Sequence, residues 1–219
     1  MKKILLVFFS LITIATFAQK VVITGTAFTL QHGELTFYLD KDTNSYVSIQ
    51  TISYDEILKL TGIRSDKWHK EPPIGSYSKE AYLHTGYDLG HLTPSNITSH
   101  NDSLNYTSFS LFNQAPQLAA FNRGKWAQLE GKVEDMIKAK KSQATIITGV
   151  LYNNKSKEFL GASRIKIPIV YYKILVFDEK TMHIWVGSNI NGLITEATIK
   201  IILDLAAANG DELGIQIKK

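Results

Sequence analysis

One stretch of this 219-residue chain, residues 122–138, spaces its apolar residues at a helical period, whereas most other apolar runs alternate or are short. Those other runs are rich in β-branched and aromatic residues and are separated by turn residues, which is typical of strands. Many short strands with few intervening helices indicate an α+β fold with a mostly antiparallel central sheet and flanking helices. The predicted helix carries its apolar stripe on Trp126, Leu129, Val133, Met136 and Ile137.

Two segments rich in Pro, Gly and Asn, residues 64–78 and 84–105, are expected to be irregular, and functional sites often lie in such loops. The first two predicted strands form a hairpin around residues 31–33, and Pro168 interrupts a later strand. Strands are predicted at 21–28, 35–39, 46–52, 106–112, 145–151, 165–177 and 182–186, and further helices at 55–60 and 195–208.

The N-terminus has the pattern of a secretory signal peptide. Two lysines precede an apolar run, and a small-x-small sequence ends at Ala18. The alternative is an uncleaved anchor, but the run is short for a span of about 20 residues. We therefore expect a signal peptide at 1–18, one domain at 19–219, no stable membrane insertion after cleavage, and a secreted or periplasmic protein.

Composition excludes some chemistries and leaves others open. The chain has no cysteine, which excludes disulfides, thiolate zinc sites and cysteine nucleophiles. Loss of Lys2 and Lys3 with the signal peptide lowers the formal charge from +4 to +2. A charge this small neither demands nor excludes a polyanionic partner, so any basic surface must be local.

His91 is the first candidate for chemistry. It follows Gly90, which can adopt backbone angles that other residues avoid, and Asp88 is placed to orient one of its ring nitrogens. A neutral imidazole can take a proton from water, as a hydrolase requires. The alternative is a histidine that is simply hydrogen-bonded within a loop, and we assign that interpretation to the other histidines.

Amide and carboxylate oxygens form the second group of candidates. Asn122 is either a helix N-cap or a ligand of Mg²⁺, which prefers hard oxygen donors. Glu130 lies eight residues later, a rise of about 12 Å along a helix, so it is either a solvated carboxylate or the holder of a metal-bound water. Asn113, at the end of a predicted strand, is either a turn residue or an amide pointing into a cleft. Trp126 is expected to be core.

Arginine is scarce, so its three positions, Arg64, Arg123 and Arg164, are candidates for phosphate contacts. Most lysines are expected to be solvated.

Three motifs in order resemble the DNA/RNA non-specific endonucleases, which include secreted bacterial nucleases and mitochondrial endonuclease G. The family pattern Asp-Arg-Gly-His followed by an apolar-Pro stretch is similar to 88–94. Its Asn with a following Pro-Gln is similar to 113–117, and its Asn-x-Gly-x-Trp-x-x-Leu-Glu matches 122–130. The later segments 147–149 and 167–173 are similar too, and the likeness covers roughly 64–205.

The resemblance implies a ββα-metal active site that hydrolyses phosphodiester bonds of DNA and RNA with little sequence specificity. His91 would be the general base, Asn122 the direct ligand of Mg²⁺ (with Mn²⁺ as the alternative ion), and Glu130 would hold a metal-bound water. Asn113 would position the histidine or the phosphate. Arg64 loosely matches an upstream family arginine, and Arg123 is placed to reach the phosphate.

One departure from the family is Leu89, which stands where the family has arginine. Two alternatives therefore stay open: a catalytically weakened nucleic-acid-binding protein on the same scaffold, and a hydrolase of another phosphodiester. The sequence leaves the oligomeric state open, with a homodimer among the options.

Overall fold

The main sheet of the protein is antiparallel throughout. A computed structural model describes residues 12–14, 20–23, 28–39, 45–70, 78–153, 158–162, 165–177, 181–209 and 215–218. Within these ranges the main sheet has seven strands in the order β11-β10-β9-β8-β5-β4-β3, and each neighbouring pair is antiparallel. The strands are β3 (Phe28–His32), β4 (Leu35–Leu39), β5 (Ser45–Ile52), β8 (Ala144–Tyr152), β9 (Pro168–Val176), β10 (Met182–Ser188) and β11 (Ile194–Glu196).

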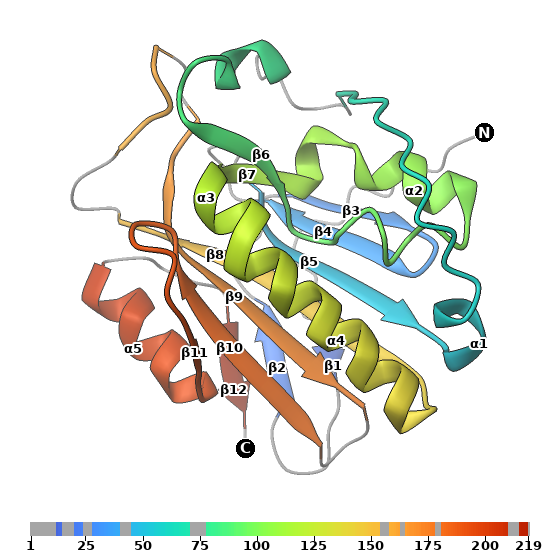
Figure 1. Cartoon of the computed structure of the whole chain (residues 1–219). Coiled ribbons are helices and arrows are strands. Elements are labelled where there is room, and N and C mark those ends of the chain that lie inside the picture. Colours follow the sequence, from blue (N-terminus) through green and yellow to red (C-terminus); the bar gives the residue numbers. More distant parts are fainter. Residues whose placement is uncertain are drawn as a thin grey trace.

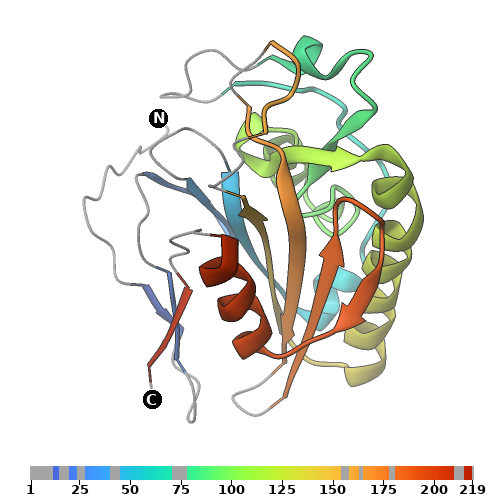
Figure 2. The ribbon, with the colours of Figure 1, turned by 90° about the vertical axis from the view of Figure 1, so that its left-hand side faces the viewer.

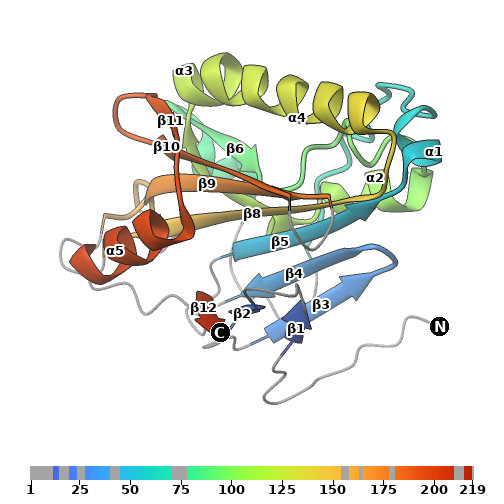
Figure 3. The ribbon, with the colours of Figure 1, turned by 90° about the horizontal axis from the view of Figure 1, so that it is seen from below.

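Helices cover both faces of this sheet. The long helix α4 (Ala127–Lys140) crosses one face over β8, β9 and β10, and α5 (Ile199–Asn209) lies against the other face (Figures 1 and 3). This arrangement explains why β8 and β9 are nearly continuous apolar runs: their side chains are buried on both sides. The α+β fold with a mostly antiparallel central sheet is thereby confirmed.

The predicted helical stripe on α4 is the centre of the main core. Trp126, Leu129, Val133 and Ile137 are all buried, and they belong to one hydrophobic cluster that also includes residues of β5, β8, β9 and, across the sheet, α5. Trp126 is fully buried, and its ring centroid lies 5.4 Å from that of Tyr171 on β9. The core role expected for Trp126 is confirmed.

A two-stranded ribbon lies beside the start of this helix. β6 (Tyr87–His91) and β7 (Gln114–Leu118) pair in antiparallel register, and α3 (Ala119–Phe121) follows β7 directly. Asn189, just after β10, ties the ribbon to the sheet. Its amide nitrogen donates to the carbonyls of Pro116 and Pro168, at 2.9 and 2.7 Å, and its amide oxygen accepts from the Leu118 backbone at 2.8 Å.

A separate small sheet lies on the side of the molecule away from α4 (Figure 2). It consists of β1 (Ile12–Ile14), β2 (Lys20–Ile23) and β12 (Ile215–Lys218). Most of the predicted signal peptide, residues 1–11 and 15–18, lies outside the described residues, and 12–14 form β1. No helix in the described ranges is long and apolar enough to cross a membrane.

Several predicted elements differ from the structure. The strand predicted at 106–112 is wrong: this segment holds the end of α2 (Asp102–Ser108) and the 3-10 helix η2 (Leu111–Asn113). The irregular segment 84–105 contains β6. The first hairpin joins β3 to β4, and residues 20–23 belong to the small sheet. Remaining short helices are α1 (Tyr54–Ile57) and the 3-10 helix η1 (Lys79–Tyr82).

Candidate active site

Gly90 lets the two strands of the ribbon approach closely just before His91. A Cβ at Gly90 would lie 2.5 Å from the Gln117 side chain and 3.0 Å from the Ala115 carbonyl oxygen. The sequence predicts that Gly90 supplies an unusual backbone angle, and this is wrong because its φ is not positive. Glycine is needed at this position for space, and the tight pairing fixes where His91 leaves the strand.

His91 lies in an aromatic surround. Its ring centroid is 5.2 Å from that of Trp68 and 5.0 Å from that of Phe109, which meets it edge-on. Its Nε2 is buried and has no hydrogen-bond partner among the described residues. Burial, and to a smaller extent the charge of Arg64, lower the pKa of His91 to about 3. The imidazole is therefore neutral at pH 7 and has one nitrogen available.

The loop that carries Trp68 and Arg64 is tied to the segment after α2. The backbone of His69 donates to the Phe109 carbonyl at 3.3 Å, and the backbone of Leu111 donates to the His69 carbonyl at 3.0 Å. The backbone of Ser65 donates to the Asn105 side chain at 2.7 Å. These bonds hold an otherwise irregular segment against His91.

Arg64 is the arginine that the fold brings to the histidine. Its Nη1 donates to Ser95 Oγ at 2.9 Å, and its Nε and Nη2 donate to Asp66 at 3.2 Å. Half of its side chain is exposed, which leaves guanidinium surface for a ligand. Its positive charge lowers the pKa of both His91 and Glu130. Arg64 is therefore close enough to both groups to act on them electrostatically.

Asn113 is buried and joins the segments on either side of the histidine. Its amide oxygen accepts from the Thr93 backbone at 2.9 Å, and its amide nitrogen donates to the carbonyls of Thr93 and Ser108 at 2.7 and 2.9 Å. Its carbonyl accepts from the Leu92 backbone at 2.9 Å. The side chain is fully buried, so it does not point into an open cleft. It instead fixes the chain immediately after His91.

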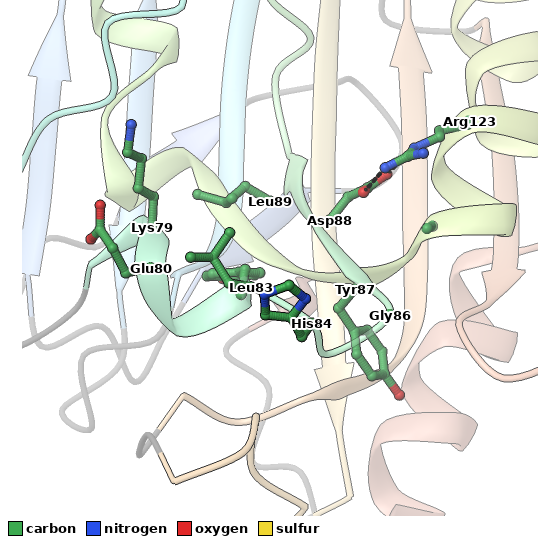
Figure 4. A pocket seen from close by; sticks show the side chains of 11 residues that line it. Lys79, Glu80, Leu83, His84, Gly86, Tyr87, Asp88, Leu89 and Arg123 are labelled. Atoms are coloured by element: carbon green, nitrogen blue, oxygen red, sulfur yellow. Dashed lines mark hydrogen bonds and ion pairs between the residues drawn. The ribbon is translucent and has the colours of Figure 1, made fainter.

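Asp88 organises Asn122 and Arg123. Its Oδ2 accepts from Asn122 Nδ2 and from Arg123 Nε, both at 2.9 Å, and its Oδ1 accepts from Arg123 Nη2 at 2.6 Å (Figure 4 shows the ion pair). Burial would raise the pKa of Asp88, but these hydrogen bonds and the charge of Arg123 lower it below its usual range. The predicted contact of Asp88 with a ring nitrogen of His91 is wrong, since its partners are Asn122 and Arg123.

Asn122 follows the last residue of α3 and has helical backbone angles, so it does not open a helix. The chain runs from α3 through the π-helical segment Asn122–Trp126 into α4, and Gly124 has non-helical backbone angles. The N-cap interpretation of Asn122 is therefore wrong. Because a carboxylate only accepts hydrogen bonds, the amide nitrogen must face Asp88, and no described residue bonds the amide oxygen. Irregular π-turns of this kind are frequent at functional sites.

Glu130, in the first turn of α4, faces a buried lysine that the sequence analysis did not single out. Lys173 Nζ lies 3.9 Å from Glu130 Oε1, donates to Thr148 Oγ1 at 2.8 Å, and sits 5.0 Å from the centre of the Trp126 ring. Burial raises the pKa of Glu130 and lowers that of Lys173, while their mutual attraction opposes both shifts. The signal was available, because Lys173 is the only charged residue of the apolar strand β9.

Asn122 and Glu130 offer the type of oxygen donor that a hard, largely hydrated cation prefers. In the described ranges no three His, Cys, Asp or Glu side chains gather closely enough to form a metal cage. The donors offered here are the free amide oxygen of Asn122 and the carboxylate of Glu130, oxygen ligands of the type Mg²⁺ prefers. Arg123 is paired with Asp88 and 74% exposed, while Arg164 lies outside the described residues.

Comparisons with known proteins identify the family to which the chain belongs. The sequence profile of the DNA/RNA non-specific endonucleases matches residues 14–207. A salivary endonuclease of Lutzomyia longipalpis is 31% identical over 109 residues, 46% of this chain and 26% of that protein. The mitochondrial nuclease EXOG of Xenopus laevis is 26% identical over 118 residues, 50% of this chain and 33% of that protein.

The matched region thus spans a quarter to a third of the length of these two relatives. The fold is also shared with a solved structure, that of the EndoG/EndoGI complex. The TM-score is 0.69 at 20% identity, and the match covers 84% of this chain and 86% of that one. Because the profile covers well over half of the chain, the protein belongs to the DNA/RNA non-specific endonuclease family.

Proposed function

We propose that this protein is a secreted or periplasmic, Mg²⁺-dependent endonuclease that hydrolyses phosphodiester bonds of DNA and RNA with little sequence specificity. Membership of the family supports the reaction class. The observation that carries the proposal is the neutral imidazole of His91, whose buried Nε2 has no partner among the described residues. A ring nitrogen without a partner has its lone pair available for a hydrogen bond from the attacking water molecule, which is the contact a general base requires.

Other residues of the chain position His91 and offer contacts to the phosphate. Asn113 and Gly90 fix the backbone on either side of His91, and Trp68 and Phe109 restrict its ring. Arg64 presents a half-exposed guanidinium beside the histidine. A guanidinium there can donate hydrogen bonds to two oxygens of one phosphate group.

Asn122 would hold the cation through its amide oxygen, and Glu130 would hold one of its waters. The bound cation would stabilise the charge that develops on the phosphate and on the leaving oxygen. Asp88 keeps the amide oxygen of Asn122 directed away from itself, and Lys173 keeps a positive charge behind Glu130. Mn²⁺ accepts the same oxygen donors and is the alternative ion.

Substrate binding would run through the phosphate backbone and would weaken as salt rises. Leu89 supplies no cation at its position on β6, which leaves Arg64 as the arginine near His91. The products would carry 5′-phosphate ends.

The test is digestion of plasmid DNA and of RNA by the mature protein with Mg²⁺, with Mn²⁺ or with EDTA, beside His91→Ala. His183→Ala is a matched control because His183 lies on β10, outside this group of residues. We expect cleavage that requires both the metal and His91. Failure of the wild type to cut either nucleic acid with both metals would overturn the proposal, and a gel-shift assay would then test the nucleic-acid-binding alternative.

A second measurement separates the metal site from catalysis. Asn122→Ala should abolish Mn²⁺ binding measured by calorimetry, whereas Glu130→Ala should weaken it more mildly. Unchanged Mn²⁺ affinity in Asn122→Ala would remove that residue as the ligand.

A further inference from the structure

A pocket of about 490 Å³ opens beside the strand that carries His91, yet none of His91, Asn122 and Glu130 lines it. The β6 residues Tyr87 and Leu89 form one wall, Leu83 and His84 form another, and Arg123 closes the side towards α4 (Figure 4). We call this the Tyr87 pocket. Its volume is within the usual range of small-molecule sites, about 300–1,000 Å³.

The walls of the Tyr87 pocket are apolar and its charges are balanced. Leu83 is 64% exposed, so its apolar surface is accessible to a ligand. The two cations each have a carboxylate close by: Arg123 bonds Asp88, and Lys79 adjoins Glu80. With no net formal charge, the pocket suits a neutral, flat group better than a phosphate.

The turn that shapes the pocket is preformed. His84 has φ of +60° and Gly86 has φ of +80°, and a left-handed conformation is strained for a residue other than glycine. Thr85 holds this turn, since its hydroxyl donates to the Tyr82 carbonyl at 2.7 Å and accepts from the Tyr87 backbone at 3.2 Å. Strain that the surrounding bonds maintain is often associated with a binding function.

The floor of the pocket is backed by packed apolar side chains. Tyr82, Leu160 and Ile165 form a small buried cluster of their own, and Tyr87 and Leu89 pack against it with part of each side chain still accessible. A ligand would therefore meet an apolar surface that already packs on the protein.

The position of the pocket relates it to the proposed site. Leu89 and His91 are two residues apart on an extended strand, a separation of about 7 Å. Successive nucleotides of a B-form strand advance by about 3.4 Å. The edge of the pocket at Leu89 therefore lies about two nucleotides from a phosphate held at His91, and Tyr87 lies two residues further along the strand.

We propose that the Tyr87 pocket receives one unpaired nucleobase of the strand being cut, next to the phosphate at His91. This inference rests on the proposed nuclease function. Tyr87 and Leu83 provide the apolar and aromatic surface on which any base can stack, without reading its identity. A base enters only when it leaves its pair, so single-stranded and flexible substrates should be preferred to rigid duplex.

The first experiment measures binding without cleavage. Full-length His91→Ala is titrated with AMP and with ribose 5-phosphate, which differ by the base alone. We expect AMP to bind at least roughly tenfold more tightly, and this advantage to be lost in Leu83→Ala on the same background. Leu58→Ala is the matched control, because Leu58 is also exposed and follows α1, far along the chain from the pocket. Equal affinity for the two ligands would overturn the proposal.

The second experiment measures cutting. A single-stranded oligonucleotide is compared with the same sequence carrying one abasic residue, and the cleaved linkages are mapped. Wild type should cut roughly tenfold more slowly at linkages within two nucleotides of the abasic position, and Leu83→Ala should not distinguish the two substrates. Identical cleavage maps for wild type would overturn the proposal. Base-dependent AMP binding without any nuclease activity would instead overturn the proposed function and leave the pocket assignment standing.

Discussion

Asp88 is the residue on which the two ends of the candidate site depend. It lies on the same strand as His91 and bonds the amide of Asn122 at 2.9 Å, so it links the histidine strand to the helix. Its carboxylate permits only one orientation of that amide. Removing the residue that hydrogen-bonds a metal ligand commonly lowers the metal affinity by about tenfold to a hundredfold. A substitution of Asp88 should therefore have a measurable effect on metal binding.

Asp88→Asn should weaken Mn²⁺ binding by roughly tenfold, because an amide can donate to Asn122 and allow its side chain to turn around. Calorimetric titration of the full chain checks this. Arg123→Ala removes the other partner of Asp88 and keeps the Asp88–Asn122 bond, so it should change affinity by less than about threefold. Equal affinities for wild type and Asp88→Asn would contradict the assignment.

Lys173 illustrates how a charge in the core depends on its partner. Lys173→Met should lower the free energy of unfolding by about 3 kcal/mol, because Glu130 would then lack its counter-charge. The double variant Lys173→Met with Glu130→Gln should recover part of this loss, since neither charge remains. Urea denaturation of the wild type, Lys173→Met, Glu130→Gln and the double variant gives the coupling. Strictly additive losses would show that the two side chains do not interact.

At the scale of elements, the β6–β7 ribbon determines where the histidine stands. It is a short two-stranded structure, and such ribbons are marginal alone. Asn189 and Tyr171, whose hydroxyl donates to the Ala115 carbonyl at 2.9 Å, anchor it to the main sheet. The position of His91 therefore depends on the contacts that β9 and the residue after β10 make with the ribbon.

Gly90→Ala should separate the strands of the ribbon, because the new methyl group would overlap Gln117 and the Ala115 carbonyl. We expect nuclease activity per folded molecule to fall at least tenfold, as a displacement of about 1 Å is enough for such a loss. Gly131→Ala is the matched control: Gly131 lies in α4 with open space around it. Full activity of Gly90→Ala with unchanged stability would show that β7 can move aside freely.

The sequence was informative where an element is long and has a single period. The stripe from Trp126 to Ile137 predicted α4 and its buried face, and the alternating or apolar runs predicted five of the main-sheet strands in outline, namely β4, β5, β8, β9 and β10. The prediction failed at 106–112 because apolar and polar residues alternate there, as they do in a strand. In the structure Asn101 caps α2 instead, since its amide oxygen accepts from the backbone of Ser103 at 2.9 Å and from that of Leu104 at 3.1 Å. Capping chemistry overrode the apparent strand period.

The candidate site was predictable only in part for a similar reason. Motif spacing singled out His91, Asn122 and Glu130, but spacing says nothing about which side chains face each other. The partner of Asp88 and the approach of Arg64 to His91 depend on pairings between segments more than 20 residues apart in sequence. Lys173 escaped attention because lysines are usually solvated, and only its apolar strand marked it as different.

At the scale of the whole molecule, the main sheet separates the site from much of the core. The histidine ribbon and α4 lie on one face, and α5 lies on the other (Figure 3). Ile202 of α5 and Leu129 of α4 are both buried in the same core, at 1% and 5% exposure. Stability is therefore shared across the sheet, whereas the chemistry is confined to one face.

This arrangement predicts that two equivalent core deletions differ in their effect on activity. Ile202→Ala and Leu129→Ala should each lower the free energy of unfolding by about 2–5 kcal/mol, since each leaves a cavity. Leu129 adjoins Glu130, so its loss should also lower nuclease activity per folded molecule, by several-fold. Ile202→Ala should keep that activity, because the sheet lies between α5 and the ribbon. Chemical denaturation and activity measured at the same temperature distinguish the two effects. Equal loss of activity in both variants would mean that α5 and the site move together through the sheet, and that the far face also determines the geometry of His91.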